Sequence, residues 1–144
     1  MCLFKEKQHY TVADEDIICF KVVRQYKKLG TDQYFSHELG FKYCVGETYT
    51  EDSVPLSVLD SLYKLEGGVF HSFITMYRGY VGNLVALNQI RLTDYRRIIL
   101  KCVIPAGTPY WKSNDVNEYA STSIKILEAI DPDDFLKNYR TFVP

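Results

Sequence analysis

The sequence predicts a single α+β domain over residues 1–144, with a curved, mainly antiparallel sheet of about five or six strands and two or three short helices. Three observations support this fold class. The chain has 144 residues, a usual length for one domain, and 47% of them are apolar. Aromatic residues make up 15% of the chain, and they favour pleated, half-buried surfaces. Strand-like and helix-like segments do not alternate regularly, which argues against a doubly wound parallel sheet.

Strand-like segments are rich in β-branched and aromatic residues. The first reads IICFKVVRQY after an acidic loop, and the clearest reads YRRIILKCVI. Gly46 lies inside the second segment and indicates a bulge, a turn or a close backbone approach there. In chain order the predicted strands are residues 16–26, 41–49, 67–73, 95–104, the short piece 110–112, and 124–127.

Helices are predicted where apolar residues recur every three or four positions. Residues 53–65 carry leucines at this spacing between Pro55, which suits a first helical turn, and Gly67, which supplies a stop. Residues 83–90 have a similar but weaker pattern, and residues 131–136 read as a capping aspartate followed by a short helix. Loop or turn is predicted for residues 27–39, 105–109 and 113–115.

Charge and hydropathy argue against several classes of function. The chain carries 17 Lys+Arg against 18 Asp+Glu, a formal net charge of −1, so it offers no basic face for nucleic acid. The densest basic cluster, Arg91, Arg96, Arg97 and Lys101, is interrupted by Asp94 and is predicted to be a solvated face. No apolar run approaches the roughly 20 residues that span a bilayer, and the N-terminus lacks the apolar stretch of a signal peptide. We therefore expect a soluble cytoplasmic protein that binds neither nucleic acid nor membrane.

The cysteines and histidines lack metal-ligand spacing. The four cysteines are spread through the chain with no CxxC pair, and His9, His37 and His71 are far apart. Phosphate-binding loops, dinucleotide fingerprints and EF-hand loops are absent from the sequence. No metal and no cofactor are therefore expected. Cys19 and Cys102 lie in apolar runs and are predicted to be small core residues.

His71 is the most prominent candidate for a site. It lies in the segment GGVFHSF, where two glycines allow close backbone approach and alternation sets His71 on the opposite face from Phe70. A histidine beside a hydroxyl, here Ser72, can act as an acid, a base or a hydrogen-bond clamp. The alternative is a partly exposed strand histidine with a structural hydrogen bond.

Three further residues complete the set of candidates. Arg24 ends the first strand and could hold a phosphate or carboxylate through two hydrogen bonds, or it could be an ordinary surface arginine. Glu118 offers a carboxylate before the last strand. Tyr110 follows the predicted turn and could line a ring-rich ligand site. The predicted ligand-binding residues are thus His71, Ser72, Arg24 and Tyr110, and the candidate catalytic residues are His71, Arg24 and Glu118.

Several motifs resemble those of a group of small bacterial and phage-borne proteins with no established activity. The matching segments are GFKYCVGETY at residues 40–49, GVFHSF at 68–73, IPAGTPY at 104–110 and ASTSIKIL at 120–127. Together with the first strand, they cover about two-thirds of the chain in the same order. The resemblance implies a shared fold and no particular chemistry.

A sparser pattern is similar to ADP-ribosyltransferase-like folds. It consists of Arg24, the segment FHS at residues 70–72, IPAGT at 104–108, and Glu118. In such folds an Arg or His holds the dinucleotide, a Ser supports it and a Glu polarises the ribose. The chain departs from this pattern because its Ser-Thr-Ser lies at residues 121–123, near the C-terminus, and because it has no Glu-x-Glu or Gln-x-Glu.

Three functions follow from these observations. The leading prediction is a small accessory protein of phage or mobile-element type that binds a protein or a small molecule, since rings suit interfaces and pockets. The second is an enzyme that processes a nucleotide or ADP-ribose, which requires His71, Arg24 and Glu118 to converge. The third is a structural subunit of a larger particle, which would carry a large exposed apolar patch.

Overall fold

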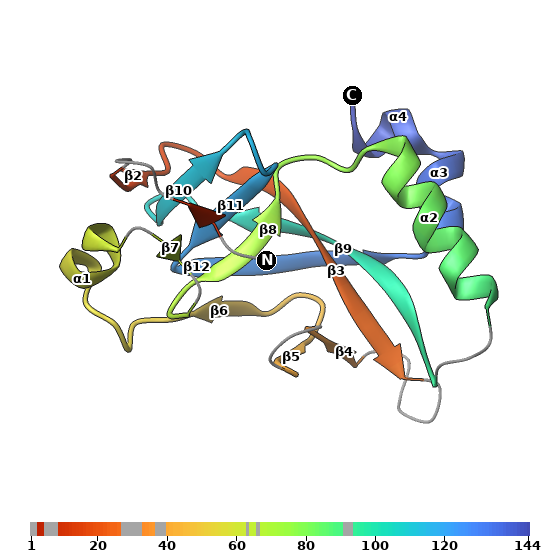
Figure 1. The fold of residues 1–144 in the computed structure, drawn as a ribbon, viewed down its shortest axis with the longest axis horizontal. Coiled ribbons are helices and arrows are strands. Elements are labelled where there is room, and N and C mark those ends of the chain that lie inside the picture. Colours follow the sequence, from red (N-terminus) through yellow and green to blue (C-terminus); the bar gives the residue numbers. More distant parts are fainter. Residues whose placement is uncertain are drawn as a thin grey trace. The chain divides into compact units, whose positions relative to one another are not determined.

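The computed structural model describes residues 3–4, 9–26, 33–36, 40–62, 64–65, 67–90 and 94–144 (Figure 1). Over these residues the chain forms a ten-stranded sheet, a two-stranded sheet and four short helices. The main strand path of the larger sheet is β2-β10-β11-β8-β3-β9-β12-β6, with β4 pairing with β3 and β5. The path has two ends, so the sheet is not closed. The predicted α+β class with a mainly antiparallel sheet is confirmed, but the predicted strand number is too low.

Contacts divide the chain into two compact units. The first comprises Met1–Cys19, Thr48–Ile74 and Cys102–Lys125, and the second comprises Phe20–Glu47, Thr75–Lys101 and Ile126–Pro144. Three long strands contribute residues to both units: β3 (Ile17–Tyr26), β9 (Tyr95–Ile104) and β12 (Ser123–Ile130). The predicted strands at residues 16–26 and 95–104 match β3 and β9 closely, because each is a long run of β-branched and aromatic residues.

Three antiparallel strands form the centre of the first unit, in the order β10 (Pro109–Ser113), β11 (Glu118–Ser121) and β8 (Phe70–Phe73). Its shorter elements are β1 (Leu3–Phe4), β2 (Thr11–Val12), β6 (Thr48–Thr50), α1 (Leu56–Ser61) and β7 (Lys64–Leu65). β2 pairs with β10, and β1 pairs with β7. The four residues of β11 are all buried, which indicates that both faces of this strand are covered.

The core of the first unit joins α1 and β7 to one face of these strands. Leu59, Leu65, Trp111 and Ala120 form a buried cluster. The Trp111 indole Nε1–H donates a hydrogen bond to Asp60 Oδ1 at 3.2 Å, which provides the polar partner that a buried tryptophan needs. The Tyr10 ring meets the indole edge-on at 6.1 Å between centroids.

Gly68 allows α1 to lie close to the chain that precedes β8. Its φ of +77° falls in the left-handed region, and a Cβ at this position would lie 2.9 Å from Val54 Cγ2 and 3.4 Å from Leu59 Cδ2. Any side chain at residue 68 would therefore be strained and would clash. The close backbone approach predicted from the glycine pair is present at Gly68.

The second unit contains the three remaining helices and the short strands β4 and β5. These elements are β4 (Tyr34–Phe35), β5 (Lys42–Tyr43), α2 (Arg78–Gln89), α3 (Pro132–Lys137) and α4 (Tyr139–Phe142). The α2 and α3 helices pack together. The fully buried Phe135 ring contacts the rings of Phe20, Tyr139 and Phe142. The Tyr139 hydroxyl donates a hydrogen bond to the Met76 carbonyl oxygen.

Several predicted segments have different bounds in the structure. The predicted strand at residues 41–49 is split into β5 and β6 by a turn in which Gly46 has a φ of +92°. The predicted loop at 27–39 contains β4; residues 27–32 and 37–39 lie outside the described part. The helix predicted at 83–90 begins earlier, at Arg78, despite two glycines in its first turns. Packing of Val81 and Leu84 in the core outweighs the low helix propensity of glycine.

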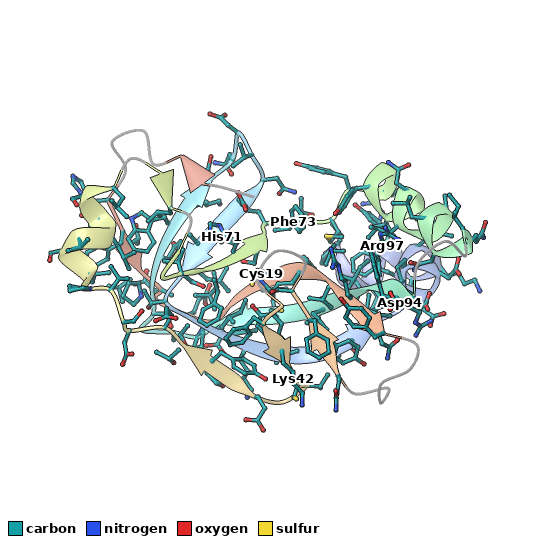
Figure 2. All side chains as sticks on the ribbon, turned by 60° about the horizontal axis from the view of Figure 1, so that its bottom comes forward. Cys19, Lys42, His71, Phe73, Asp94 and Arg97 are labelled. Carbon is teal, nitrogen blue, oxygen red and sulfur yellow. The ribbon has the colours of Figure 1, made fainter. Side chains whose placement is uncertain are left out.

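The cysteines behave as the sequence predicts. Cys19 and Cys102 are completely buried, and Cys19 lies within β3 (Figure 2). Among the described residues, Cys19, Cys44 and Cys102 do not form disulfides. Cys19 and Cys102 therefore act as small apolar core residues.

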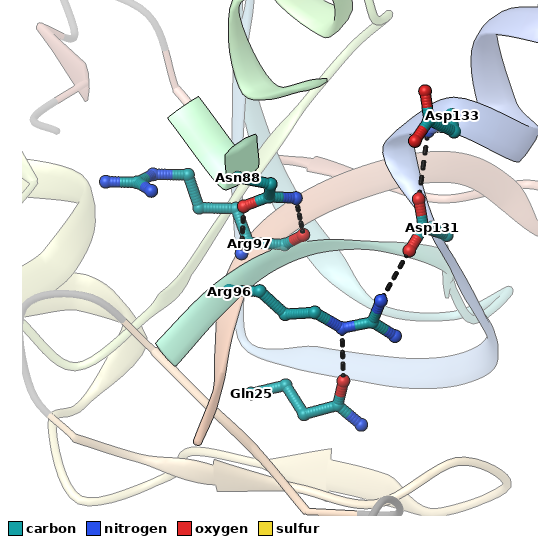
Figure 3. A network of polar contacts seen from close by, with 6 residues as sticks. All are labelled: Gln25, Asn88, Arg96, Arg97, Asp131 and Asp133. Carbon is teal, nitrogen blue, oxygen red and sulfur yellow. Dashed lines mark hydrogen bonds and ion pairs between the residues drawn. The ribbon is translucent and has the colours of Figure 1, made fainter. Parts of the chain in front are cut away.

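A polar network fastens the start of α3 to β3 and β9 in the second unit (Figure 3). Asp131 caps α3 by accepting a hydrogen bond from the Asp133 backbone N–H at 3.0 Å. Its other oxygen accepts from Arg96 Nη1 at 2.6 Å, and Arg96 Nε donates to Gln25 Oε1 at 2.8 Å. This confirms the helix cap predicted at residue 131 and gives it a second role as the partner of Arg96.

Replacing Asp131 by alanine is expected to lower the free energy of unfolding by about 1–2 kcal/mol, because both the cap and the ion pair are lost. Asp131→Asn keeps an oxygen that can cap α3 and should cost less than about 1 kcal/mol. Urea unfolding followed by circular dichroism measures both values. Equal losses in the two variants would show that the charge, and not the cap, carries the effect.

Candidate functional site

The first unit brings two of the candidate residues together. His71 Nδ1 lies 3.5 Å from Glu118 Oε1. The Glu118 side chain is 1% exposed and the His71 side chain is 17% exposed. Figure 2 shows His71 and Phe73 on the same strand, β8. We refer to these two side chains as the His71–Glu118 pair.

Strand register explains why these two residues meet. In the antiparallel pairing of β8 and β11, His71 lies opposite Ala120 and Phe73 lies opposite Glu118. Residues two apart on a strand share a face, so His71 and Glu118 are diagonal neighbours on one face of the sheet. Trp111 lies opposite Ala120 on the third strand and shares that face. The pair therefore lies beside apolar side chains, which lowers the local dielectric around it.

Ser72 and Tyr110 belong to the other face of the same strands. Ser72 lies opposite Tyr119, and the Tyr110 and Tyr119 rings meet edge-on at 5.8 Å. The Lys112 ammonium lies 5.8 Å from the centroid of the Tyr119 ring. Because alternate residues of a strand point to opposite faces, the structure does not combine Ser72 or Tyr110 with His71.

Arg24 belongs to the second unit and lies among aromatic rings. Its guanidinium carbon is 4.7 Å from the centroid of the Tyr95 ring, and it is paired with Phe35 of β4 across the strands. The nucleotide-site hypothesis required Arg24 beside His71 and Glu118. The described contacts bring together two of these three residues, His71 and Glu118, within one unit.

A second histidine–carboxylate contact in the first unit was not predicted. His9 Nδ1 lies 2.7 Å from Asp60 Oδ2, while Asp60 Oδ1 accepts hydrogen bonds from the Tyr10 backbone N–H and from Trp111 Nε1. The His9 side chain is largely exposed. His9 and Asp60 lie 51 positions apart in the chain, and so do Asp60 and Trp111. Local sequence therefore carried no signal for this contact.

The described residues contain neither a metal site nor a membrane-spanning helix. No group of three or more His, Cys, Asp or Glu side chains among them could hold a metal ion. None of the helices in the described part is long and apolar enough to cross a bilayer.

Tyr119, on the opposite face of β11 from Glu118, makes the stability of the first unit depend on pH in the alkaline range. Burial raises the pKa of Tyr119 above its usual value of 10.0, and the neighbouring Cys19 and Tyr110 raise it further. A phenol with a raised pKa in the folded state contributes stability that is fully present below pH 10 and is lost as the pH rises through the folded-state pKa.

Tyr119→Phe should therefore unfold less readily than the wild-type protein above pH 10, relative to the difference between them at pH 7. Thermal unfolding measured from pH 7 to pH 11 gives this comparison. Tyr77→Phe is a suitable control, because Tyr77 is exposed. Parallel pH profiles for the wild type and Tyr119→Phe would contradict the expectation.

Comparison with known proteins gives no relative from which a function could be transferred. The chain matches no protein-family model, no curated protein and no solved structure.

Proposed function

We propose that this chain is a small binding protein, of phage or mobile-element accessory type, that recognises a small molecule through the His71–Glu118 pair. The observation that carries the proposal is the state of Glu118. Its carboxylate is 1% exposed, and within the described part of the chain its Oε1 atom has no hydrogen-bond partner. The contact to His71 Nδ1, at 3.5 Å, is longer than a normal hydrogen bond.

Burying such a group is costly. A buried carboxylate without good hydrogen bonds loses its hydration and regains little of that energy from the protein. Proteins retain such groups where a ligand supplies the missing interaction. A donor on a ligand, such as an ammonium, amide or hydroxyl group, would complete the coordination of Glu118.

The surroundings favour a small molecule over a protein surface. Glu118 is almost completely buried, whereas His71 is the member of the pair that retains contact with solvent. A flat protein surface does not reach a carboxylate at this depth, so the proposed ligand is a small donor group that enters beside the imidazole. Phe73 is only partly buried, lies on the same face and offers apolar contact to the rest of such a ligand.

The proposal is tested with small fragments that carry a hydrogen-bond donor: primary amines, carboxamides and alcohols. Carboxylate fragments, which carry the same charge as Glu118, serve as the comparison. Binding is followed by ligand-observed NMR with the wild-type protein, Glu118→Gln and Glu128→Gln. Glu128 is an exposed glutamate on β12 and serves as the matched control. We expect donor fragments to bind the wild type and Glu128→Gln alike, and to bind Glu118→Gln roughly tenfold more weakly.

Two results would overturn this function. One is that no donor fragment binds the wild-type protein. The other is that the fragments that bind do so equally well with Glu118→Gln, provided that circular dichroism shows this variant to be folded.

The proximity of His71 and Glu118 also favours a second candidate, an enzyme that processes a nucleotide or ADP-ribose. A carboxylate beside an imidazole can stabilise developing positive charge or move a proton, and such contacts often shorten when substrate binds. Incubation with NAD⁺ and measurement of released nicotinamide tests this candidate. Release by the wild type that is absent from Glu118→Gln would support it, and no release by the wild type would exclude NAD⁺ as its substrate.

A further inference from the structure

Two arginines of the second unit share one tyrosine ring. The guanidinium carbons of Arg24 and Arg97 lie 4.7 Å and 5.2 Å from the centroid of the Tyr95 ring. Arg24 belongs to β3 and Arg97 to β9, which are neighbouring strands. Two positive charges are therefore held close to the same small ring.

Strand geometry places these two arginines on one face. The Tyr26 ring, at the end of β3, packs edge-on against the Tyr95 ring, at the start of β9, with centroids 5.8 Å apart. Because the last residue of β3 lies beside the first residue of β9, these two strands run in opposite directions here. Arg24 and Arg97 each lie two residues from these tyrosines, so all four side chains share a face.

Arg96, the residue before Arg97 on β9, lies on the other face of the strand. Arg96 is neutralised by Asp131 and also bonds Gln25, as Figure 3 shows, whereas the Arg97 side chain extends away from it. Among the described residues, no carboxylate forms an ion pair with Arg97. Arg97 and Arg96 therefore differ, since the charge of Arg96 is balanced by a carboxylate within this part of the chain.

Arg97 is also fixed in position by its backbone. The Asn88 side chain of α2 accepts a hydrogen bond from the Arg97 N–H at 2.8 Å and donates one to the Arg97 carbonyl oxygen at 3.0 Å (Figure 3). Burial raises the pKa of Tyr80, and the positive charge of Arg97 acts against this rise, so the guanidinium lies within electrostatic reach of that hydroxyl. The helix thus holds the backbone from which the Arg97 side chain extends.

We propose that Arg24 and Arg97, together with Tyr95, form a binding site for a phosphate group. Two guanidinium groups from neighbouring strands offer positive charge to one dianion. Guanidinium groups bind the oxygens of a phosphate through paired hydrogen bonds. The ligand is inorganic phosphate or a small phosphomonoester. This site belongs to the second unit and does not depend on the His71–Glu118 pair.

An NMR titration of ¹⁵N-labelled protein tests the site. Inorganic phosphate and adenosine monophosphate are added separately at constant ionic strength, and the arginine Nε–H signals are followed. We expect the Arg24 and Arg97 signals to shift together with one dissociation constant, while the Arg140 signal of α4 stays in place. Tighter binding of the nucleotide would identify an organic phosphate as the ligand, and equal binding would identify the phosphate group alone.

Variants of Arg97 and Arg140 distinguish a specific phosphate site from non-specific attraction of phosphate to positive charge. Arg97→Gln should weaken phosphate binding roughly tenfold or more. Arg97→Lys keeps the charge but loses the paired hydrogen bonds, so its affinity should fall between that of Arg97→Gln and the wild type. Arg140→Gln removes an exposed charge of the same kind and should leave the affinity unchanged. The proposal is overturned if phosphate moves neither Arg24 nor Arg97, or if Arg97→Gln and Arg140→Gln have the same affinity.

Discussion

Replacing His71 by leucine is expected to lower the free energy of unfolding by about 1–3 kcal/mol. The substitution leaves the Glu118 carboxylate buried beside an apolar side chain, with its contact at 3.5 Å removed. Much of the loss is thus the penalty of an uncompensated buried charge, and only part is the value of the contact itself. Urea unfolding at pH 7 measures the change.

The double variant His71→Leu/Glu118→Leu distinguishes a functional pair from a structural one. With both polar groups replaced by apolar ones, stability should return to within about 1 kcal/mol of the wild type or exceed it. Fragment binding should be lost in the same protein. A double variant that loses the sum of the two single losses would instead assign the pair a structural role in this part of the sheet.

Replacing Trp111 by alanine is expected to destabilise the protein by about 3–5 kcal/mol. The indole is 1% exposed and packs in the cluster with Leu59, Leu65 and Ala120, so its removal leaves a cavity in the core of the first unit. Loss of the Nε1–H donor also removes one of the hydrogen bonds that orient Asp60. Urea unfolding followed by far-ultraviolet circular dichroism, which does not depend on tryptophan fluorescence, gives the value.

Trp111→Phe separates these two contributions. It keeps a ring in the core but cannot donate to Asp60, which still accepts from the Tyr10 backbone N–H. Trp111→Phe should lower the free energy of unfolding clearly less than Trp111→Ala does, because a smaller cavity forms. If both variants lost the same stability, the hydrogen bond to Asp60 would outweigh the packing of the indole.

The candidate site could be predicted only in part. Local pattern singled out His71, because the glycines before it and the alternation along its strand are visible within seven residues. Glu118 was also singled out, but as one member of a polar segment. Their meeting depends on the register of β8 with β11, and these strands are separated by more than 40 residues. A shift of one residue would have brought Ser72, not His71, to that face.

Local chemistry was sufficient for the elements that need few partners. The long apolar strands β3 and β9, the buried Cys19 and Cys102, and the Asp131 cap each follow from a short run of residues, since β propensity, burial and capping act within a few positions. Short strands such as β4 and β5, the pairing of Glu118 with His71, and the two arginines on Tyr95 depend on segments that are distant in the chain. Their position is set by strand pairing and packing, which form only when the whole chain folds and which no local pattern encodes.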